Sequence, residues 1–373
     1  MTACYFEIRP LRPTLAGLLL AFTFFSFSLQ SGAQSNSLQS GAQSKPLPSG
    51  VQSNSLQRRA QSSAQPDVSA KWSAAPGGGS CIVLAEQAEK RIVIANVDRG
   101  KIIWEWSAQS GGLPATAVNW FTNPSDVKVV YGGQYLLTTA SGGGVALIRI
   151  SDRKTMFYAY AGGNPHSAEL LPDGNIVVAS STGNYLTVFK TDTLSATLKT
   201  AALGGTAAYS KRIPVAFGHN VVWDRKGQLL WTAAMNQLIA YRYNGDCAHP
   251  DLKAVDSFPL PGTEAHDLFP VYGSNVLWLT NTTNVYLFDL ATHKLTQAST
   301  PQKNIKSISS GPKGYPVIMV TPKEKWWTDE IRDSNGKQVF YQGGLKIYKA
   351  RWFLPNLFSY REDDLFKQCI SNN

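Results

Sequence analysis

Short apolar runs recur along the chain, separated by turns rich in Gly, Asp and Asn. Six of these runs are almost wholly apolar: Cys81–Ala85, Tyr135–Thr139, Ile176–Ser180, Leu229–Ala233, Val276–Thr280 and Pro316–Val320. Runs of this length, bounded by turn residues, are typical of buried strands.

A second kind of run follows each apolar one and alternates between apolar and polar residues. These runs are Arg91–Val97, Val145–Ile150, Tyr185–Phe189, Leu238–Tyr243, Val285–Leu290 and Leu345–Phe353. More exposed third strands, such as Ile102–Trp106 and Met156–Tyr160, come after the next turn. Period-two alternation with short polar turns predicts antiparallel sheet.

A further segment precedes the apolar run and repeats along the chain. It begins at His166 (HSAELLPDGN), His219 (HNVVWDRKGQ) and His266 (HDLFPVYGSN), and at the same offset Ser125 and Lys306 begin two more copies. The starts are 41, 53, 47 and 40 residues apart. A repeat of this length with four strands predicts an all-β, six-bladed β-propeller, with seven blades as the alternative.

The first repeat lacks an obvious inner strand, because residues 71–80 are rich in Gly. We expect Asn356–Cys369 to complete the first or the last blade and so to close the ring. Closure removes exposed sheet edges, which otherwise invite aggregation.

The chain ahead of the repeats has a different character. Residues 1–33 have the basic, apolar and small-residue regions of a signal peptide, and four nonapeptides of the SGAQSNSLQ type follow. Residues 34–69 therefore predict a flexible linker, and residues 70–373 the propeller. We expect an exported protein, secreted, periplasmic or at the cell surface, that is monomeric and inserts no segment into a membrane.

The charge indicates which class of ligand the protein binds, and the cysteines leave two possible arrangements. The formal net charge is +10, and the Lys and Arg residues are scattered. This distribution excludes a clustered nucleic-acid surface and suits an acidic glycan. Cys81 and Cys369 lie near the two ends of the repeats, so a disulfide between them and a pair of buried thiols are equally expected.

In a propeller, the loops that enter the inner strands converge at one mouth of the axis. Ser125, His166, His219, His266 and Lys306 are therefore expected to form a ring there. Histidines that only bond to neighbouring backbone are the alternative. Three neutral imidazoles can bind a divalent metal, so His166, His219 and His266 are also candidate metal ligands. Equally, one histidine or Lys306 can transfer a proton.

Loops on the same face carry aromatic and charged residues suited to sugar binding. The candidates are Trp120, Phe121, Lys211, Arg212, Trp326 and Trp327, with Glu86 at the end of an apolar strand. Residues 323–344 are expected to be a long insertion in the sixth repeat. Anchoring of Trp326 and Trp327 to the domain is the alternative reading of that segment.

The segments CIVLAEQAEKRIVIANV and HSAELLPDGNIVVASS resemble an uncharacterised family of exported bacterial β-propellers. The histidine ring is similar in placement to that of propeller-fold oligogalacturonate lyases, which hold a metal, and of propeller glycosidases with an axial histidine. The resemblance implies a lyase or hydrolase acting on uronate-containing glycans. A propeller that binds ligands or scaffolds other proteins without catalysis is the alternative.

Overall fold

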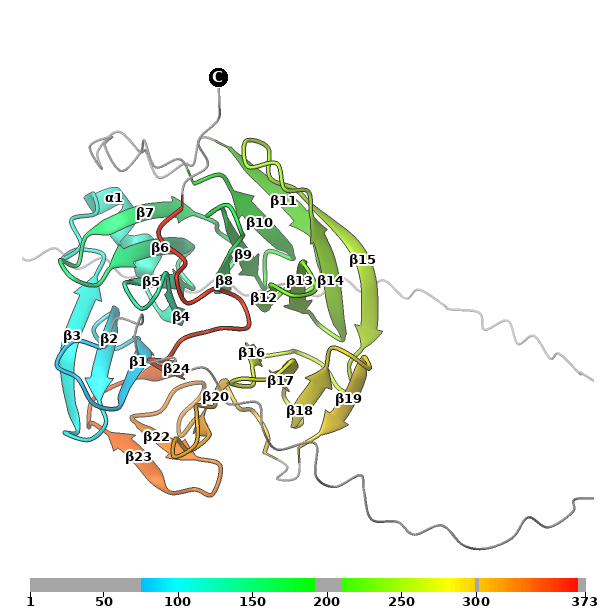
Figure 1. The fold of residues 1–373 in the computed structure, drawn as a ribbon. Helices are drawn as coiled ribbons and strands as arrows, with labels where there is room; N and C mark the ends of the chain where they lie inside the picture. The colour runs from blue at the N-terminus through cyan, green and yellow to red at the C-terminus, as the bar shows by residue number, and fades with distance from the viewer. Residues whose placement is uncertain (1–74, 192–208, 299–301, 368–373) are drawn as a thin grey trace, which may run out of the picture. The chain divides into compact units, whose positions relative to one another are not determined.

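The computed structural model describes residues 75–191, 209–298 and 302–367, all within one compact unit, residues 64–373. In these residues six four-stranded antiparallel sheets surround a common axis (Figure 1). The predicted six-bladed propeller is confirmed. The predicted signal peptide and nonapeptide linker lie outside the described residues.

Blades two to six each use four consecutive strands. Blade two contains β4 (Pro124–Val130), β5 (Tyr135–Ala140), β6 (Gly144–Arg149) and β7 (Thr155–Tyr160). Blade three contains β8 (Pro165–Leu170), β9 (Ile176–Ser180), β10 (Tyr185–Phe189) and β11 (Ser210–Pro214). Blade four contains β12 (Asn220–Asp224), β13 (Leu229–Ala233), β14 (Gln237–Tyr243) and β15 (Leu252–Pro259). Blade five contains β16 (Asp267–Pro270), β17 (Val276–Thr280), β18 (Val285–Asp289) and β19 (Lys294–Gln297). Blade six contains β20 (Ser307–Ser309), β21 (Ile318–Val320), β22 (Glu330–Asp333) and β23 (Gln338–Tyr341).

Blade one is closed by the C-terminal part of the chain. Its sheet order is β24 (Ile347–Trp352), β1 (Cys81–Glu86), β2 (Arg91–Asn96) and β3 (Lys101–Ser107). The expected closing strand at residues 356–369 was wrong. Residues 345–353, expected as a strand of the sixth repeat, supply the inner strand of blade one instead.

Two further sequence expectations were wrong in their local structure. Residues 323–344 are not an insertion, because β22 and β23 are the two outer strands of blade six. Lys211 and Arg212, expected on a loop, lie on a strand, because β11 pairs with β10 along Ser210–Pro214. Only a short helix, α1 (Ala115–Val118), and a 3-10 turn, η2 (Asn119–Phe121), interrupt the strands of the described ranges.

Alternation along the inner strands separates a packing surface from a polar one. One set of positions packs between blades, each member in a different hydrophobic cluster: Val127, Ala168, Val221, Leu268, Ile308 and Ala350. Because successive side chains of a strand point to opposite sides, the intervening residues face the axis. The six clusters seal the blades to one another and leave the axis to polar side chains.

The end of the described chain covers the axial end opposite the histidines. Residues 354–367, drawn in red, cross this end in Figure 1. The backbone N–H of Arg225 donates to the carbonyl of Phe358 at 3.3 Å, and Phe366 stacks on Tyr135 with ring centroids 5.3 Å apart. This segment therefore closes the axial end opposite the histidines.

The cysteines do not form the disulfide that was one of the two expected arrangements. Cys81 is a buried free thiol, so the bridge between Cys81 and Cys369 was wrong, whereas Cys247 is disulfide-bonded. No helix among the described residues is long and apolar enough to cross a bilayer.

Candidate functional site: a charged axis beneath an imidazole and lysine mouth

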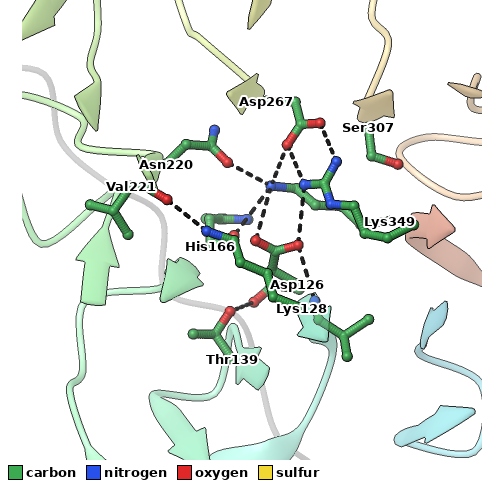
Figure 2. A network of polar contacts seen from close by, with 12 residues as sticks. Asp126, Lys128, Thr139, His166, Asn220, Val221, Asp267, Ser307 and Lys349 are labelled. Carbon is green, nitrogen blue, oxygen red and sulfur yellow. Dashed lines mark hydrogen bonds and ion pairs between the residues drawn. The ribbon is translucent and has the colours of Figure 1, made fainter. Parts of the chain in front are cut away.

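The axis is filled by ionised side chains from the inner strands (Figure 2). The buried charged groups are Asp126, Lys128, Glu169, Asp267, Lys349 and Arg351. Three are acidic and three basic, so the axis is close to neutral as a whole. This balance is required, since an unpaired charge in a dry interior costs several kcal/mol.

Arg351 makes the strongest contacts of this network. Its guanidinium donates to both carboxylate oxygens of Asp267 at 2.6 Å and to Asp126 at 3.3 Å. Burial by itself would raise the pKa of Asp267, but the charges of Arg351 and Lys349 outweigh it and lower that pKa. Asp267 is therefore a fixed anion.

Lys349 and Lys128 complete the network. The Lys349 ammonium donates to Asn220 Oδ1 at 2.9 Å and to Asp267 at 3.3 Å, and burial lowers the pKa of Lys349. Lys128 donates to Glu169 at 3.0 Å and to the carbonyl of Val221 at 2.6 Å. Every carboxylate of the axis is thus engaged by a cation.

The residue before each axial position lies at the mouth. These residues are Ser125, His166, His219, His266, Lys306 and Tyr348. The imidazoles of His166 and His219 stack with centroids 4.0 Å apart, and those of His219 and His266 lie 5.6 Å apart at 74°. The three histidines that sequence analysis grouped do meet.

Ser125 and Tyr348 play different parts in the ring. The Ser125 hydroxyl is turned away, since it donates to the carbonyl of Pro165 at 2.6 Å. Tyr348, which sequence analysis missed, takes the sixth place with its ring 5.5 Å from that of His166.

The imidazoles are neutral and under-bonded. Burial, followed by the neighbouring cations and imidazoles, lowers the pKa of His166 and His219 well below the usual range and that of His266 to about 3. Nδ1 of all three rings, and Nε2 of His219, have no hydrogen-bond partner among the described residues. Buried polar atoms left in this way are uncommon and point to a ligand or to ordered water.

Lys306 is the most accessible cation of the mouth. Its Nζ lies 3.0 Å from Nε2 of His266, and burial lowers the pKa of Lys306 to about 8. Because the ammonium can only donate, Nε2 of His266 accepts and Nδ1 carries the ring proton. Glu264, at the mouth, acts on Lys306 in the opposite sense and raises its pKa.

The histidines do not fit a three-ligand metal site. Two rings are stacked face to face, and Nε2 of His266 is occupied by Lys306. A metal needs nitrogen lone pairs that converge on one point at about 2.0–2.1 Å. In the described part of the chain no group of three or more His, Cys, Asp or Glu side chains could hold a metal ion.

The other predicted site residues lie in several places. Glu86 is buried at the end of β1, where it accepts from the backbone of Ala88 at 2.6 Å and from Arg91 at 3.1 Å. Phe121 is buried in the core beside Trp106, and Trp120 packs half-buried on Tyr160.

Lys211 and Arg212 belong to an outer strand, away from the mouth. Lys211 pairs with Asp251 at 2.6 Å, in the turn between β14 and β15 at the far end of the blades. Arg212 lies over the ring of Tyr185, 4.3 Å from its centroid.

Trp326 and Trp327 do lie on the histidine face, in the loop between β21 and β22. The sequence missed Asp126, Lys128, Lys349 and Arg351 as axial residues. A signal was present in the alternation of Lys349 and Arg351 with Ala350 and Trp352, but assigning that run to the sixth repeat concealed it.

Taken together, the fold and the site define a six-bladed propeller whose buried, charged axis lies beneath a ring of imidazoles and one lysine. The chain belongs to the family described as Family of unknown function (DUF6528), whose model matches residues 70–368. No curated protein matches the sequence.

Two solved structures resemble the chain. One is a protein of unknown function from Bacteroides caccae, 14% identical, with a TM-score of 0.50, covering 74% of this chain and 99% of that one. The other is hydrazine synthase from Kuenenia stuttgartiensis, 14% identical, with a TM-score of 0.41, covering 60% of this chain and 64% of that one. The first of these likenesses supports the fold alone.

Proposed function

We propose that this protein is an exported lyase that binds a uronate-containing glycan at the imidazole and lysine mouth. The observation that carries the proposal is the contact between Lys306 and His266, in a mouth that also holds buried imidazole nitrogens without partners. A pKa of about 8 leaves part of the Lys306 amine uncharged near neutral pH.

Lys306 is better suited than the histidines to remove a proton. A base works best when its pKa is near the operating pH. The pKa of His266, lowered to about 3 by burial and by Lys306, makes its imidazole a poor base. In this proposal His266 is a positioning residue that holds the Lys306 amine, and the remaining imidazole N–H groups donate to the substrate carboxylate.

The step is a β-elimination. The neutral amine of Lys306 takes the C5 proton of the uronate, the C4–O bond breaks, and a C4–C5 double bond forms. The leaving oxygen takes a proton from the Lys306 ammonium or from water, so atoms and charge balance. Charge that develops on the carboxylate is stabilised by donors already in place.

A lyase is favoured over a hydrolase by the state of the carboxylates. Glycoside hydrolases typically use two carboxyl groups that face the scissile bond. Asp126, Glu169 and Asp267 are all paired with axial cations, and Glu264 is the carboxylate that acts on Lys306 at the mouth. Metal-assisted chemistry stays a prediction that this geometry does not favour.

A non-catalytic binding protein is the second candidate. The burial of His166 and His219, 7% and 3% exposed, favours it, since these rings offer little surface to a reacting sugar.

One experiment separates the two candidates. Purified protein is incubated with polygalacturonate, and the unsaturated product is followed by its ultraviolet absorbance. We expect product from the wild type, none from Lys306→Ala, and wild-type rates from Lys303→Ala, an exposed lysine of the same loop. Binding without product would support the second candidate, and equal rates in both variants would overturn the lyase.

A further inference from the structure

Exposed aromatic residues gather at one end of the propeller. Among the described residues the exposed aromatic side chains are Tyr160, Trp326 and Tyr341, at 49%, 44% and 50% exposure. Tyr160 ends β7 and Tyr341 ends β23, and both strands run toward the histidine end. Trp326 lies in the β21–β22 loop at the same end. Large exposed aromatics on one face usually mark an interaction site.

The loop that carries Trp326 is held against blade one. A tight turn joins Glu324 to Trp327, and Thr328 exchanges two backbone hydrogen bonds with Ile347, at 3.1 and 2.7 Å. Ile347 begins β24, the strand that carries Tyr348 and two of the three axial cations, Lys349 and Arg351. The loop is therefore fixed in place beside the mouth.

A side-chain relay fixes the indole itself. Trp326 Nε1 donates to Gln87 Oε1 at 3.0 Å, and Gln87 Nε2 donates to the carbonyl of Pro124 at 3.1 Å. Pro124 directly precedes Ser125 of the mouth. The ring is thus oriented with its polar edge satisfied and much of its surface open to solvent, which lowers the entropic cost of stacking a ligand on it.

Lysines accompany these aromatic rings. Lys325 lies 5.8 Å from the centroid of Trp326, and Lys346 lies 5.1 Å from that of Trp327. Lys323 lies 5.8 Å from Tyr341 but is paired with Asp329 at 2.9 Å. No ion pair is found for Lys325 or Lys346 in the described ranges, so their charge is available to an anionic partner.

We propose that Trp326, Tyr341, Lys325 and Lys346 form a subsite, the blade-six platform, for a distal part of an acidic polysaccharide chain. The inference rests on the proposed function and deepens it, because a ligand that reaches both the mouth and the platform must be longer than one sugar. The aromatic faces stack on sugar rings. The lysines attract the carboxylate or sulfate groups that an acidic polysaccharide carries on every sugar or every second sugar.

The platform is tested by comparing polymer with short substrate. We expect Trp326→Ala and Tyr341→Ala each to weaken polygalacturonate binding roughly tenfold, with turnover of a trigalacturonate left nearly unchanged. Leu365→Ala is the matched control, since Leu365 is 69% exposed at the opposite end. Unchanged polymer affinity in both aromatic variants would overturn the platform.

Charge is tested separately. Lys325→Gln and Lys346→Gln should weaken polygalacturonate binding and reduce its salt dependence, whereas Lys226→Gln, at the opposite end, should change neither. Equal affinity for a neutral dextran, or tighter binding of a single-stranded oligonucleotide, would also overturn the inference. If Lys306→Ala lost turnover while the platform variants bound polygalacturonate as tightly as the wild type, the proposed function would be supported and the platform would be overturned.

Discussion

Lys306 and His266 show how one contact at the mouth assigns roles that residue type alone leaves open. Histidine is the usual side chain for proton transfer near neutral pH. Here burial and the neighbouring cations hold the imidazole pKa values far below that range, while burial brings the pKa of Lys306 to about 8. The functional group near neutral pH is therefore the amine, and the rings act as neutral donors and acceptors.

The pH dependence of turnover follows from this assignment. The fraction of Lys306 that is a neutral amine increases as the pH rises through about 8. We therefore expect kcat/KM to rise with pH and to level off above about pH 9. Lys306→Arg should be inactive at every pH, because a guanidinium stays protonated. Initial rates between pH 6 and 10 check this. A rate that falls above pH 8 would mean that the charged lysine is required.

His219 allows stability and function to be separated. Both of its ring nitrogens are buried without partners, which costs about 1–3 kcal/mol for each unsatisfied group. His219→Phe should therefore leave the free energy of unfolding unchanged or raise it, while lowering glycan binding. Chemical denaturation and a binding titration measure the two effects. Lower stability with unchanged binding would assign His219 to structure alone.

At the scale of elements, the strand β24 both closes the ring of blades and supplies charged side chains to the axis. It is the inner strand of blade one, and it carries two of the three axial cations. Arg351 reaches Asp267 on β16 and Asp126 on β4, so one strand connects blades that are far apart in sequence.

Arg351→Met tests this connection. Removing the guanidinium leaves Asp267 and Asp126 buried with less compensation, and a loss of about 3–5 kcal/mol of unfolding free energy is expected. Arg149→Met is the matched control, because Arg149 pairs with Asp152 at the surface and should cost at most about 1 kcal/mol. Urea denaturation measures the free energy of unfolding of both variants. Equal effects would show that the axial pairs do not stabilise the fold.

At the scale of the whole molecule, the buried imidazoles couple stability to pH. Their pKa values are lowered on folding, so the unfolded chain binds more protons as pH falls below about 6.5. Stability is then lost on acidification, before Asp126 and Asp267, whose pKa values are also lowered by the neighbouring cations, begin to protonate.

Each imidazole that stays neutral in the folded protein should cost about 1.6 kcal/mol of unfolding free energy between pH 6.5 and pH 5, with a slope that approaches about 1.4 kcal/mol for each pH unit. His219→Phe should reduce the slope, and His249→Gln should not, because the His249 side chain is 73% exposed. Thermal and urea unfolding across pH 5–8 measure it. A flat profile would contradict neutral buried rings.

Sequence alone determined the repeat and predicted the meeting of His166, His219 and His266, because strand periodicity and repeat offset are local properties of the chain. It could not place Leu345–Phe353, since an isolated alternating run carries no information on which sheet it joins. Only the tertiary structure decided that this strand returns to blade one and brings Lys349 and Arg351 to the axis. It also decided the charge states at the mouth, because burial and distant cations, not spacing along the chain, set the pKa values of His266 and Lys306.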